Sequence, residues 1–344
     1  MKILIFSDIH WSQNTSILRK QGNKYSIRLE LLVNTLNWIN KIALDYKCSA
    51  MICAGDMMDR SDCNDIELTS LKDIIWNGLP CYFLVGNHES SVMDLRYTTL
   101  KPLESSTSKI ISSPMNIILG DSQIHFIPYV TENMRKHLKD YLLNIDNSKH
   151  QIIISHNDLK GIRYGKYESK MGFDIKEIES MSDLYLNGHL HNGAWITKKI
   201  LNLGSSTAHN FSNDSFKFNY GVWVLDTDTL ELDFIENPYS LNFYKIEIDK
   251  KEDIDLIKGI KNHAVLSIKC NNMFKDEVKQ MLDNNPKVLT YKLIVYVEND
   301  SSDSSNENKV ELGGLDYIER FKEFIIDNIG SDAIVMEELE EVCK

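Results

Sequence analysis

Residues 3–10 read ILIFSDIH, and they introduce a pattern that recurs through the first half of the chain. At each occurrence, a short apolar run rich in β-branched residues stops abruptly at residues able to ligate a metal ion. The junctions lie at 3–10 (ILIFSDIH), 50–59 (AMICAGDMMD), 81–89 (CYFLVGNHE), 152–158 (IIISHND) and 184–191 (LYLNGHLH). Continuous apolar runs of this length predict strands that are buried on both faces.

The stretches between the first strands predict helices. Residues 27–44 carry apolar side chains at helical spacing, and residues 66–76 show the same pattern. Strands that alternate with helices predict a layered α/β domain, in which a site lies beyond the carboxyl ends of the strands. Strands that each end in Asp, Asn or His would therefore direct these side chains to one place.

The candidate ligands have the chemistry of a two-metal phosphoesterase site. They are Asp8 and His10 (DxH), Asp56 (GDxxD), Asn87 (GNH), His156, and His189 and His191 (GHxH). Each motif alone is weak, because Asp56 could cap a helix and a single histidine is usually structural. As an ordered set they supply the carboxylate, imidazole and amide ligands that hold two divalent metals about 3.5–4 Å apart, with one carboxylate bridging both.

The sequence changes character after residue 201. Residues 221–226 and 230–235 predict a β-hairpin, and Pro238 and Tyr239 mark an expected domain boundary. We predict a catalytic domain at 1–240, a small α+β domain at 241–298, a flexible polar linker at 299–312 and C-terminal helices at 313–344. The C-terminal helical prediction rests on an amphipathic stripe formed by Leu315, Ile318, Phe321, Ile325 and Ile329.

The charge balance bears on possible substrates. The 344 residues include 38 Lys+Arg and 50 Asp+Glu, for a net charge of -12, which argues against a simple basic DNA-binding module. Residues 1–240 contribute 24 basic and 28 acidic side chains, whereas residues 241–344 contribute 14 and 22. Two bound dications would bring the first part to about zero. The acidity therefore does not exclude DNA, but it implies that much of the affinity for DNA comes from elsewhere.

Composition also bears on the compartment. The six cysteines show neither CxxC nor Cys/His zinc spacing, which favours free thiols in a reducing environment. The N-terminal apolar run is shorter than the roughly 7–15 residues of a signal peptide core. No run approaches the roughly 18 apolar residues of a membrane span. We expect a soluble cytoplasmic protein without a membrane partner.

The ordered set DIH (8–10), GDMMD (55–59), GNHE (86–89), SHND (155–158) and GHLH (188–191) resembles the calcineurin-like metallophosphoesterases. The resemblance covers roughly residues 1–240 and implies a four-layer α-β-β-α sandwich. It also implies two divalent metal ions, Mn²⁺ with Mg²⁺ as the alternative. One ion would be held by Asp8, His10, Asp56 and His191, and the other by Asp56, Asn87, His156 and His189. By the same resemblance, His88 binds no metal but contacts the phosphate and assists departure of the leaving oxygen.

Within this superfamily, the chain is similar to SbcD-type DNA repair nucleases, and in particular to the recombination endonuclease subunits of T-even-type phages. The similarity rests on 127–129 (IPY), 156–161 (HNDLKG), 204–205 (GS) and 225–229 (LDTDT). It implies a DNA exonuclease or endonuclease that processes double-strand breaks or recombination intermediates, located in the host cytoplasm if the chain is phage-encoded. It further implies a capping domain at 241–298, a homodimer, and an SMC-like ATPase partner (SbcC-type) that binds the C-terminal helices.

The sequence also departs from that family. Asp59 stands where some members have a histidine, Glu89 replaces the commoner aspartate, and Arg60 could grip phosphate as in protein phosphatases. A small-molecule phosphodiesterase or a protein phosphatase is therefore the alternative, whereas a non-catalytic scaffold is disfavoured because no ligand is missing. Two further groups are expected to border the site: Lys160, Arg163, Tyr164, Lys166 and Lys170 as a DNA-gripping loop, and His209, Asn210 and Asn213.

Overall fold

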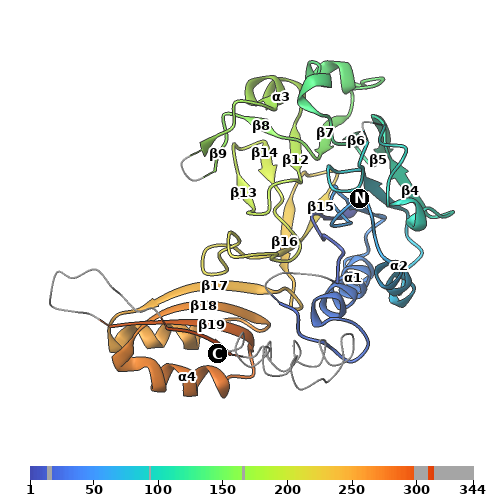
Figure 1. Ribbon diagram of the computed structural model, residues 1–344. Helices are drawn as coiled ribbons and strands as arrows, with labels where there is room; N and C mark the ends of the chain where they lie inside the picture. Colours follow the sequence, from blue (N-terminus) through green and yellow to red (C-terminus); the bar gives the residue numbers. More distant parts are fainter. Residues whose placement is uncertain (14–17, 93, 165–166, 298–308, 314–344) are drawn as a thin grey trace. The chain divides into compact units, whose positions relative to one another are not determined.

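The computed structural model describes residues 1–13, 18–92, 94–164, 167–297 and 309–313, and Figure 1 shows their arrangement. The chain divides into two compact units, Met1–Tyr244 and Lys245–Lys344. The first unit contains two six-stranded sheets, and the second contains most of a four-stranded sheet. None of the helices in the described part of the chain has both the length and the apolar composition required to cross a membrane.

The first sheet of unit 1 has a parallel centre. Its parallel strands are β1 (Lys2–Phe6), β2 (Ala50–Cys53), β3 (Cys81–Leu84) and β4 (Ser108–Ile111). The antiparallel hairpin β15 (Gly221–Asp226) and β16 (Leu232–Glu236) extends the sheet beside β1. This hairpin corresponds to the one predicted at 221–235.

The second sheet of unit 1 has the same plan. Its parallel strands are β6 (Ser122–Ile127), β7 (His150–Ser155), β12 (Leu184–Asn187) and β14 (Ile200–Asn202). Antiparallel strands β5 (Met115–Leu119) and β13 (Ala194–Trp195) form its edges. The sequence pattern did not indicate β4, β5 or β14.

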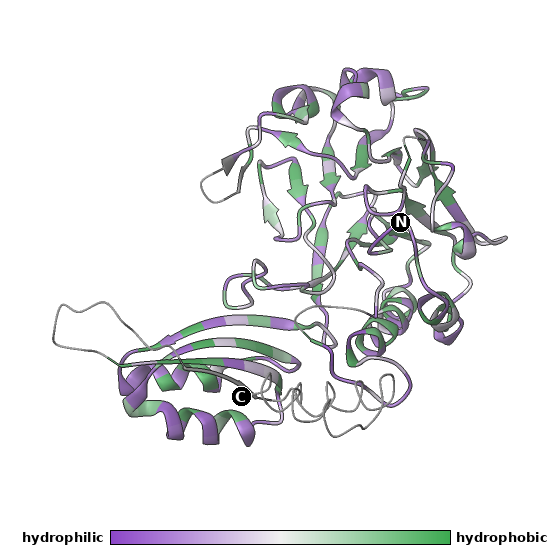
Figure 2. Cartoon of the chain, in the orientation of Figure 1, coloured by the Kyte–Doolittle hydropathy of each residue, from purple (hydrophilic) through white to green (hydrophobic). Residues whose placement is uncertain are grey.

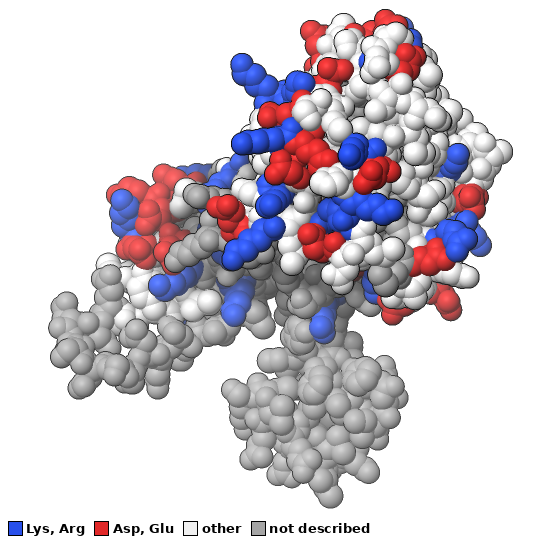
Figure 3. All heavy atoms as spheres, turned by 90° about the horizontal axis from the view of Figure 1, so that it is seen from above, with Lys and Arg blue, Asp and Glu red and all other residues white. Residues whose placement is uncertain are grey.

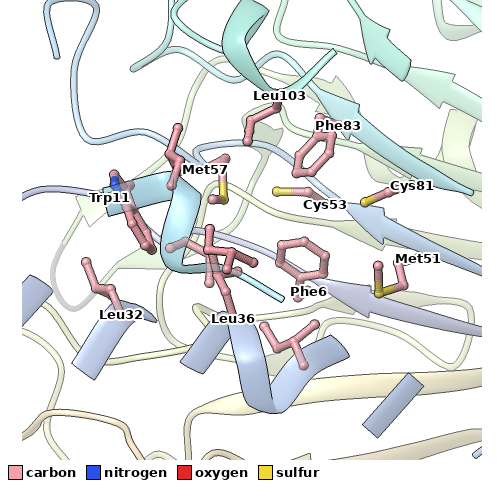
Figure 4. Close-up of a cluster of buried hydrophobic side chains, with 14 of the residues drawn as sticks. Phe6, Trp11, Leu32, Leu36, Met51, Cys53, Met57, Cys81, Phe83 and Leu103 are labelled. Atoms are coloured by element: carbon pink, nitrogen blue, oxygen red, sulfur yellow. The ribbon is translucent and has the colours of Figure 1, made fainter. Parts of the chain in front are cut away.

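The two sheets pack face to face and are covered on their outer sides. On β1, Ile3 and Ile5 pack between the sheets, whereas Leu4 and Phe6 pack toward helix α1 (Ile27–Asp45). Figure 4 shows this outer cluster, in which Leu36 of α1 lies beside Phe6 and Leu32 lies near Trp11. Helix α3 (Ile175–Met181) and the 3₁₀ helix η4 (Leu138–Tyr141) cover the other sheet. The fold is thus the predicted four-layer α-β-β-α sandwich. Its central strands β1, β2, β3 and β12 are mainly apolar because both of their faces are largely buried, whereas the edge strands β5, β13 and β16 are partly exposed (Figure 2).

One predicted helix is shorter than expected. Residues 66–76 were expected to be helical, but α2 covers Asp65–Ser70 and the 3₁₀ helix η1 covers Leu71–Asp73. The backbone N–H groups of Ile75 and Asn77 donate instead to the side chains of Asn37 and Asn40 on α1. These tertiary hydrogen bonds satisfy the donors that a longer helix would use, so the chain becomes extended at Ile74.

Unit 2 has an α+β arrangement and contains most of the four-stranded sheet. Strand β17 (Asn242–Ile248) crosses the boundary between the units, followed by β18 (Ala264–Asn271), β19 (Val288–Tyr296) and β20 (Lys309–Gly313). The 3₁₀ helix η5 (Lys251–Gly259) and helix α4 (Lys275–Asp283) lie between the strands in sequence. Strand β20 pairs with β19, so the linker predicted at 299–312 does not extend to residues 309–312. The rest of that linker and the predicted C-terminal helices after residue 313 lie outside the described residues.

The remaining elements are short. They are the 3₁₀ helices η2 (Lys101–Leu103), η3 (Glu132–Met134) and η6 (Asn272–Phe274), and the two-residue strands β8 (Leu159–Lys160), β9 (Arg163–Tyr164), β10 (Tyr167–Glu168) and β11 (Phe173–Asp174). Strands β9 and β10 form a small hairpin in the predicted DNA-gripping loop. Lys166 of that loop lies outside the described residues.

Candidate metal centre

The predicted ligands gather at one edge of the sandwich, where the parallel strands of both sheets end. Turns after β1, β2 and β3 carry Asp8, His10, Asp56 and Asn87, and turns after β7 and β12 carry the three histidines His156, His189 and His191. The first two turns are joined by backbone hydrogen bonds from Asp8 N to Gly55 O (3.1 Å) and from His10 N to Asp56 O (3.0 Å). Glycine is required at position 86, because a Cβ there would collide with Asp56.

Four donor atoms form a first group. Asn87 Oδ1 lies 2.9 Å from His189 Nδ1 and 3.3 Å from His156 Nε2, which in turn lies 3.1 Å from Asp56 Oδ2. Donors bound to one ion at about 2.1 Å are roughly 3 Å apart, and these spacings match that requirement. The group combines one carboxylate, one amide oxygen and two imidazoles, which suits a divalent cation.

A second group is built around Asp8. His10 Nε2 and His191 Nε2 are 3.0 Å apart, and Asp8 Oδ1 lies 4.0 Å and 3.8 Å from them. Asp8 Oδ2 accepts hydrogen bonds from the hydroxyl of Ser7 and from His189 N, whereas the buried Oδ1 has no hydrogen-bond partner among the described residues. A buried carboxylate oxygen without a donor is costly unless a cation neutralises it. The arrangement therefore fits a metal ion at this position.

Asp56 lies between the two groups. Its Oδ1 accepts a hydrogen bond from His88 N (3.1 Å), and its Oδ2 lies 3.9 Å from His10 Nε2 as well as 3.1 Å from His156 Nε2. A single oxygen is thus shared by both groups, as a bridging carboxylate requires. All seven predicted ligands are brought together. Ligand atoms within 4.8 Å of one another form three groups among the described residues: His10, His191 and His209; His10, Asp56 and His88; and Asp56, His156 and His189.

Partners outside the ligand groups fix the orientation of the imidazoles. His156 Nδ1 donates to Ala54 O (2.7 Å), His10 Nδ1 faces Asp59 Oδ1 (3.3 Å), and His189 Nε2 faces Asp158 Oδ1 (3.3 Å). When one ring nitrogen donates to such a partner, the other presents its lone pair to a metal. The sequence offered no role for Asp158 and left that of Asp59 open. The only sequence signal for a role of Asp158 was its position two residues after His156.

The clustered charges shift the pKa values of the ligands in the metal-free chain. Burial alone would raise the pKa of Asp56, but the surrounding His156, His10 and His88 hold it well below its usual range. Burial opposes protonation of His156, yet the adjacent Asp56 raises its pKa to about 10. Burial lowers the pKa of His191 to about 4. The centre is thus a concentrated anionic and imidazole site of the kind that binds cations.

His88 and Glu89 have separate roles. His88 Nδ1 donates to Asp59 O (2.6 Å), its side chain is 41% exposed, and its Nε2 lies 4.0 Å from Asp56 Oδ2. The carboxyl of Glu89 is bonded to backbone N–H groups of two turns. It is fully buried and accepts hydrogen bonds from Met58 N (3.0 Å) and Gly86 N (2.5 Å), so it joins the second and third turns. Burial and the charge of Asp56 raise the pKa of Glu89 to about 8.

Arg60 is committed to the scaffold rather than to the centre. Its guanidinium donates to Glu67 Oε2 (2.5 Å), Ser12 Oγ (3.1 Å) and Asp62 O (3.2 Å). Glu67 is fully buried and closes the capping box of α2 with Asn64. Three of the five N–H donors of Arg60 are therefore engaged by the scaffold, which ties its guanidinium to Glu67 of α2 rather than leaving it free for a phosphate-gripping role.

Two hollows adjoin the centre. One, of about 730 Å³, begins at Gly86 and Asn87 and continues past Tyr129 to Arg96 and Lys136. The other, of about 620 Å³, begins at His189 and His191 and is lined by Asn192, Asn213 and Phe218. The predicted border residue Asn213 thus faces a hollow, whereas His209 is buried behind His10 and His191, with ring centroids 4.6 and 5.0 Å away.

A comparison with protein-family models supports the same chemistry. A family model described as calcineurin-like phosphoesterase matches residues 1–193, a range that includes all five motif junctions. Among solved structures, the protein TT1561 of Thermus thermophilus is similar, with 13% sequence identity and a TM-score of 0.37. The alignment covers 68% of this chain and 98% of that protein. No match was found among curated proteins.

Proposed function

The chain belongs to the calcineurin-like phosphoesterase family, and on that premise we propose that it is a metal-dependent DNA nuclease. In this proposal it hydrolyses DNA phosphodiesters during double-strand-break processing or recombination, together with an SMC-like ATPase. The observation that carries hydrolysis is the pair of donor groups that share Asp56 Oδ2, with the exposed His88 beside them.

The residues of the centre divide the work of hydrolysis. Asp8, His10, Asp56 and His191 would hold one divalent ion, and Asp56, Asn87, His156 and His189 the other. Two such ions, Mn²⁺ or Mg²⁺, lower the pKa of water and offset charge that develops on phosphate oxygens. Asp59 O accepts the Nδ1 proton of His88, which leaves Nε2 directed away from that contact. When protonated, His88 Nε2 can donate to the departing oxygen.

Several features favour DNA over the alternatives. The hollows that adjoin Asn87 and the pair His189 and His191 leave room for substrate on more than one side of a scissile phosphate. Lys160 and Lys170, in the loop that follows His156, are exposed and can contact a phosphate backbone. The engagement of Arg60 by Glu67 disfavours the protein-phosphatase alternative. The motifs shared with SbcD-type nucleases support the same substrate.

The direct test uses one metal and four substrates. The purified chain with Mn²⁺ is offered linear duplex DNA, single-stranded DNA, bis(p-nitrophenyl) phosphate and a phosphopeptide. We expect cleavage of DNA and of the small diester, both abolished by chelator and by Asp56→Asn. Rapid phosphopeptide hydrolysis without DNA cleavage would sink the nuclease proposal and favour a protein phosphatase. Hydrolysis of the small diester alone would favour a small-molecule phosphodiesterase.

The basic loop provides a prediction that separates DNA binding from chemistry. The double variant Lys160→Glu/Lys170→Glu reverses two charges in this loop. It should raise KM for DNA several-fold and weaken the salt dependence of that KM, because phosphate contacts are lost. Hydrolysis of bis(p-nitrophenyl) phosphate should be unchanged. Lys41→Glu, an exposed reversal on α1, is the matched control and should leave both substrates unaffected. An equal loss of activity on bis(p-nitrophenyl) phosphate would contradict a DNA-binding role for these lysines.

A further inference from the structure

The DxH turn is conformationally unusual. Asp8 and His10 both have positive φ, 52° and 48°, although neither is glycine. Side chains disfavour this left-handed region, and such residues persist only where their surroundings fix them. The N–H side of the turn is fixed by Gly55 O and Asp56 O of the following turn. The carbonyl side must be fixed by something else.

Two buried side chains bind these carbonyl groups. His209 Nε2 lies 2.8 Å from Asp8 O, and Arg28, near the start of α1, donates from its Nη2 to His10 O at 3.2 Å. Arg28 Nη2 also lies 3.3 Å from His209 Nδ1. Each strained residue therefore has its own donor, and the two donors contact each other.

The contacts determine the protonation pattern of His209. A guanidinium only donates hydrogen bonds, so Nδ1 of His209 must accept from Arg28. Nε2 then carries the proton and donates it to Asp8 O. Both ring nitrogens are occupied, and His209 has no lone pair left for a metal. This excludes His209 as a ligand, although its ring nitrogen lies within 4.8 Å of those of His10 and His191.

Burial of the charged Arg28 side chain at this position is energetically costly. Arg28 is only 4% exposed, and its Nε has no hydrogen-bond partner among the described residues. A buried cation beside a site for two dications is energetically unfavourable unless other interactions offset the cost of its burial. Asp59 and Glu67 offset part of its charge. The hydrogen bond from Arg28 to the carbonyl of the strained residue His10 is one such interaction.

We propose that Arg28 and His209 are a positioning pair that holds the DxH turn in its left-handed conformation, so that Asp8 and His10 converge on one metal ion. The proposal rests on the metal centre of the proposed function but not on its substrate. His209 also packs edge-on against the rings of His10 and His191, and the role proposed for both residues is exerted through their hydrogen bonds to the backbone of the turn.

The test compares two conservative variants of His209. In His209→Gln, the amide nitrogen occupies the Nε2 position and can still donate to Asp8 O, whereas in His209→Asn it sits one atom short. Mn²⁺ binding to the metal-free protein is followed by calorimetry and by electron paramagnetic resonance, in which an exchange-coupled Mn²⁺ pair has a characteristic spectrum. We expect His209→Gln to bind two ions nearly as tightly as the unchanged protein. His209→Asn and Arg28→Met should lose about 10–100-fold affinity at one ion only, with a mononuclear spectrum.

The control and the contrary outcomes are defined in the same titrations. Asn40→Ala removes a buried side chain farther along α1, and it should lower the melting temperature without changing either affinity. Equal Mn²⁺ affinities for the folded Gln and Asn variants would overturn the proposal, as would wild-type binding in Arg28→Met. If the unchanged protein binds no Mn²⁺, the metal centre itself is wrong and the pair with it. Two-ion binding without DNA cleavage would overturn only the nuclease proposal.

Discussion

His88 is the residue whose role can be separated most cleanly from metal binding. It is partly exposed and is fixed through Nδ1 by Asp59 O. We expect His88→Ala to retain two Mn²⁺ ions and to lose about 10²–10⁴ in kcat on DNA, the usual contribution of a general acid. The loss should be smaller on bis(p-nitrophenyl) phosphate, because p-nitrophenolate leaves without help. Parallel loss of metal in calorimetry would contradict this assignment.

His156 predicts proton release when metal binds. Its pKa of about 10 in the metal-free chain means that it is protonated at pH 7.5, yet a metal ligand must be neutral. Since the folded pKa lies above the ordinary value of 6.5, the stability from the Asp56–His156 pair is complete below about pH 6.5 and is lost as pH rises through about 10. Titrating Mn²⁺ at pH 7.5 in two buffers of different ionisation enthalpy should show about one proton released. Identical heats in both buffers would rule this out.

Residue types at strand ends were predictable, but their hydrogen-bond partners were not. The ligands follow from apolar runs that end in Asp, Asn or His, because parallel strands place their carboxyl ends at one edge. The roles of Asp59, Asp158 and Glu89 depend on side-chain directions that one sequence does not specify. Arg28 did leave a signal, since it is a charged residue four positions before Leu32 on the buried face of a helix.

At the scale of elements, Arg60 links α2 to the chain after β1. Its guanidinium joins Glu67 of α2 to Ser12, and Glu67 is fully buried. Arg60→Met should therefore lower the free energy of unfolding by about 1–3 kcal/mol, because buried acceptors lose their donor. Chemical denaturation of the metal-free protein measures this, and KM for bis(p-nitrophenyl) phosphate should not change. A large rise in that KM, with unchanged stability, would restore Arg60 as a phosphate-gripping residue.

The elements that sequence analysis misjudged share one cause. The predicted helix at 66–76 ends early because Asn37 and Asn40 of α1 bind the N–H groups of the following segment. Strand β20 falls in a range predicted as linker, and it is a strand because β19 offers it an edge. Both depend on partners distant in sequence, whereas α1 was predictable from its own periodicity, with its end displaced by one residue.

At the scale of the whole molecule, charge is unevenly divided. Residues 1–244 carry 24 Lys+Arg and 28 Asp+Glu, and residues 245–344 carry 14 and 22. Figure 3 shows basic and acidic side chains interspersed on the face it displays, without one dominant basic field among the described residues there. A nuclease with this surface would bind DNA weakly by itself. The proposed ATPase partner would supply the missing affinity.

The proposed ATPase contact yields a prediction that depends on where the chain is cut. A deletion from residue 299 would remove β20 and expose the edge of β19, so loss of the partner could reflect damage to the second sheet. A deletion that begins after Gly313 keeps this strand and removes only the predicted docking helices. It should abolish co-purification with a co-expressed SMC-like ATPase while leaving hydrolysis of bis(p-nitrophenyl) phosphate intact. A full-length chain with Leu315, Ile318 and Phe321 changed to Asp should behave in the same way, because the apolar stripe, not chain length, would bind the partner. Retained co-purification by either chain would refute the docking role of the C-terminal segment.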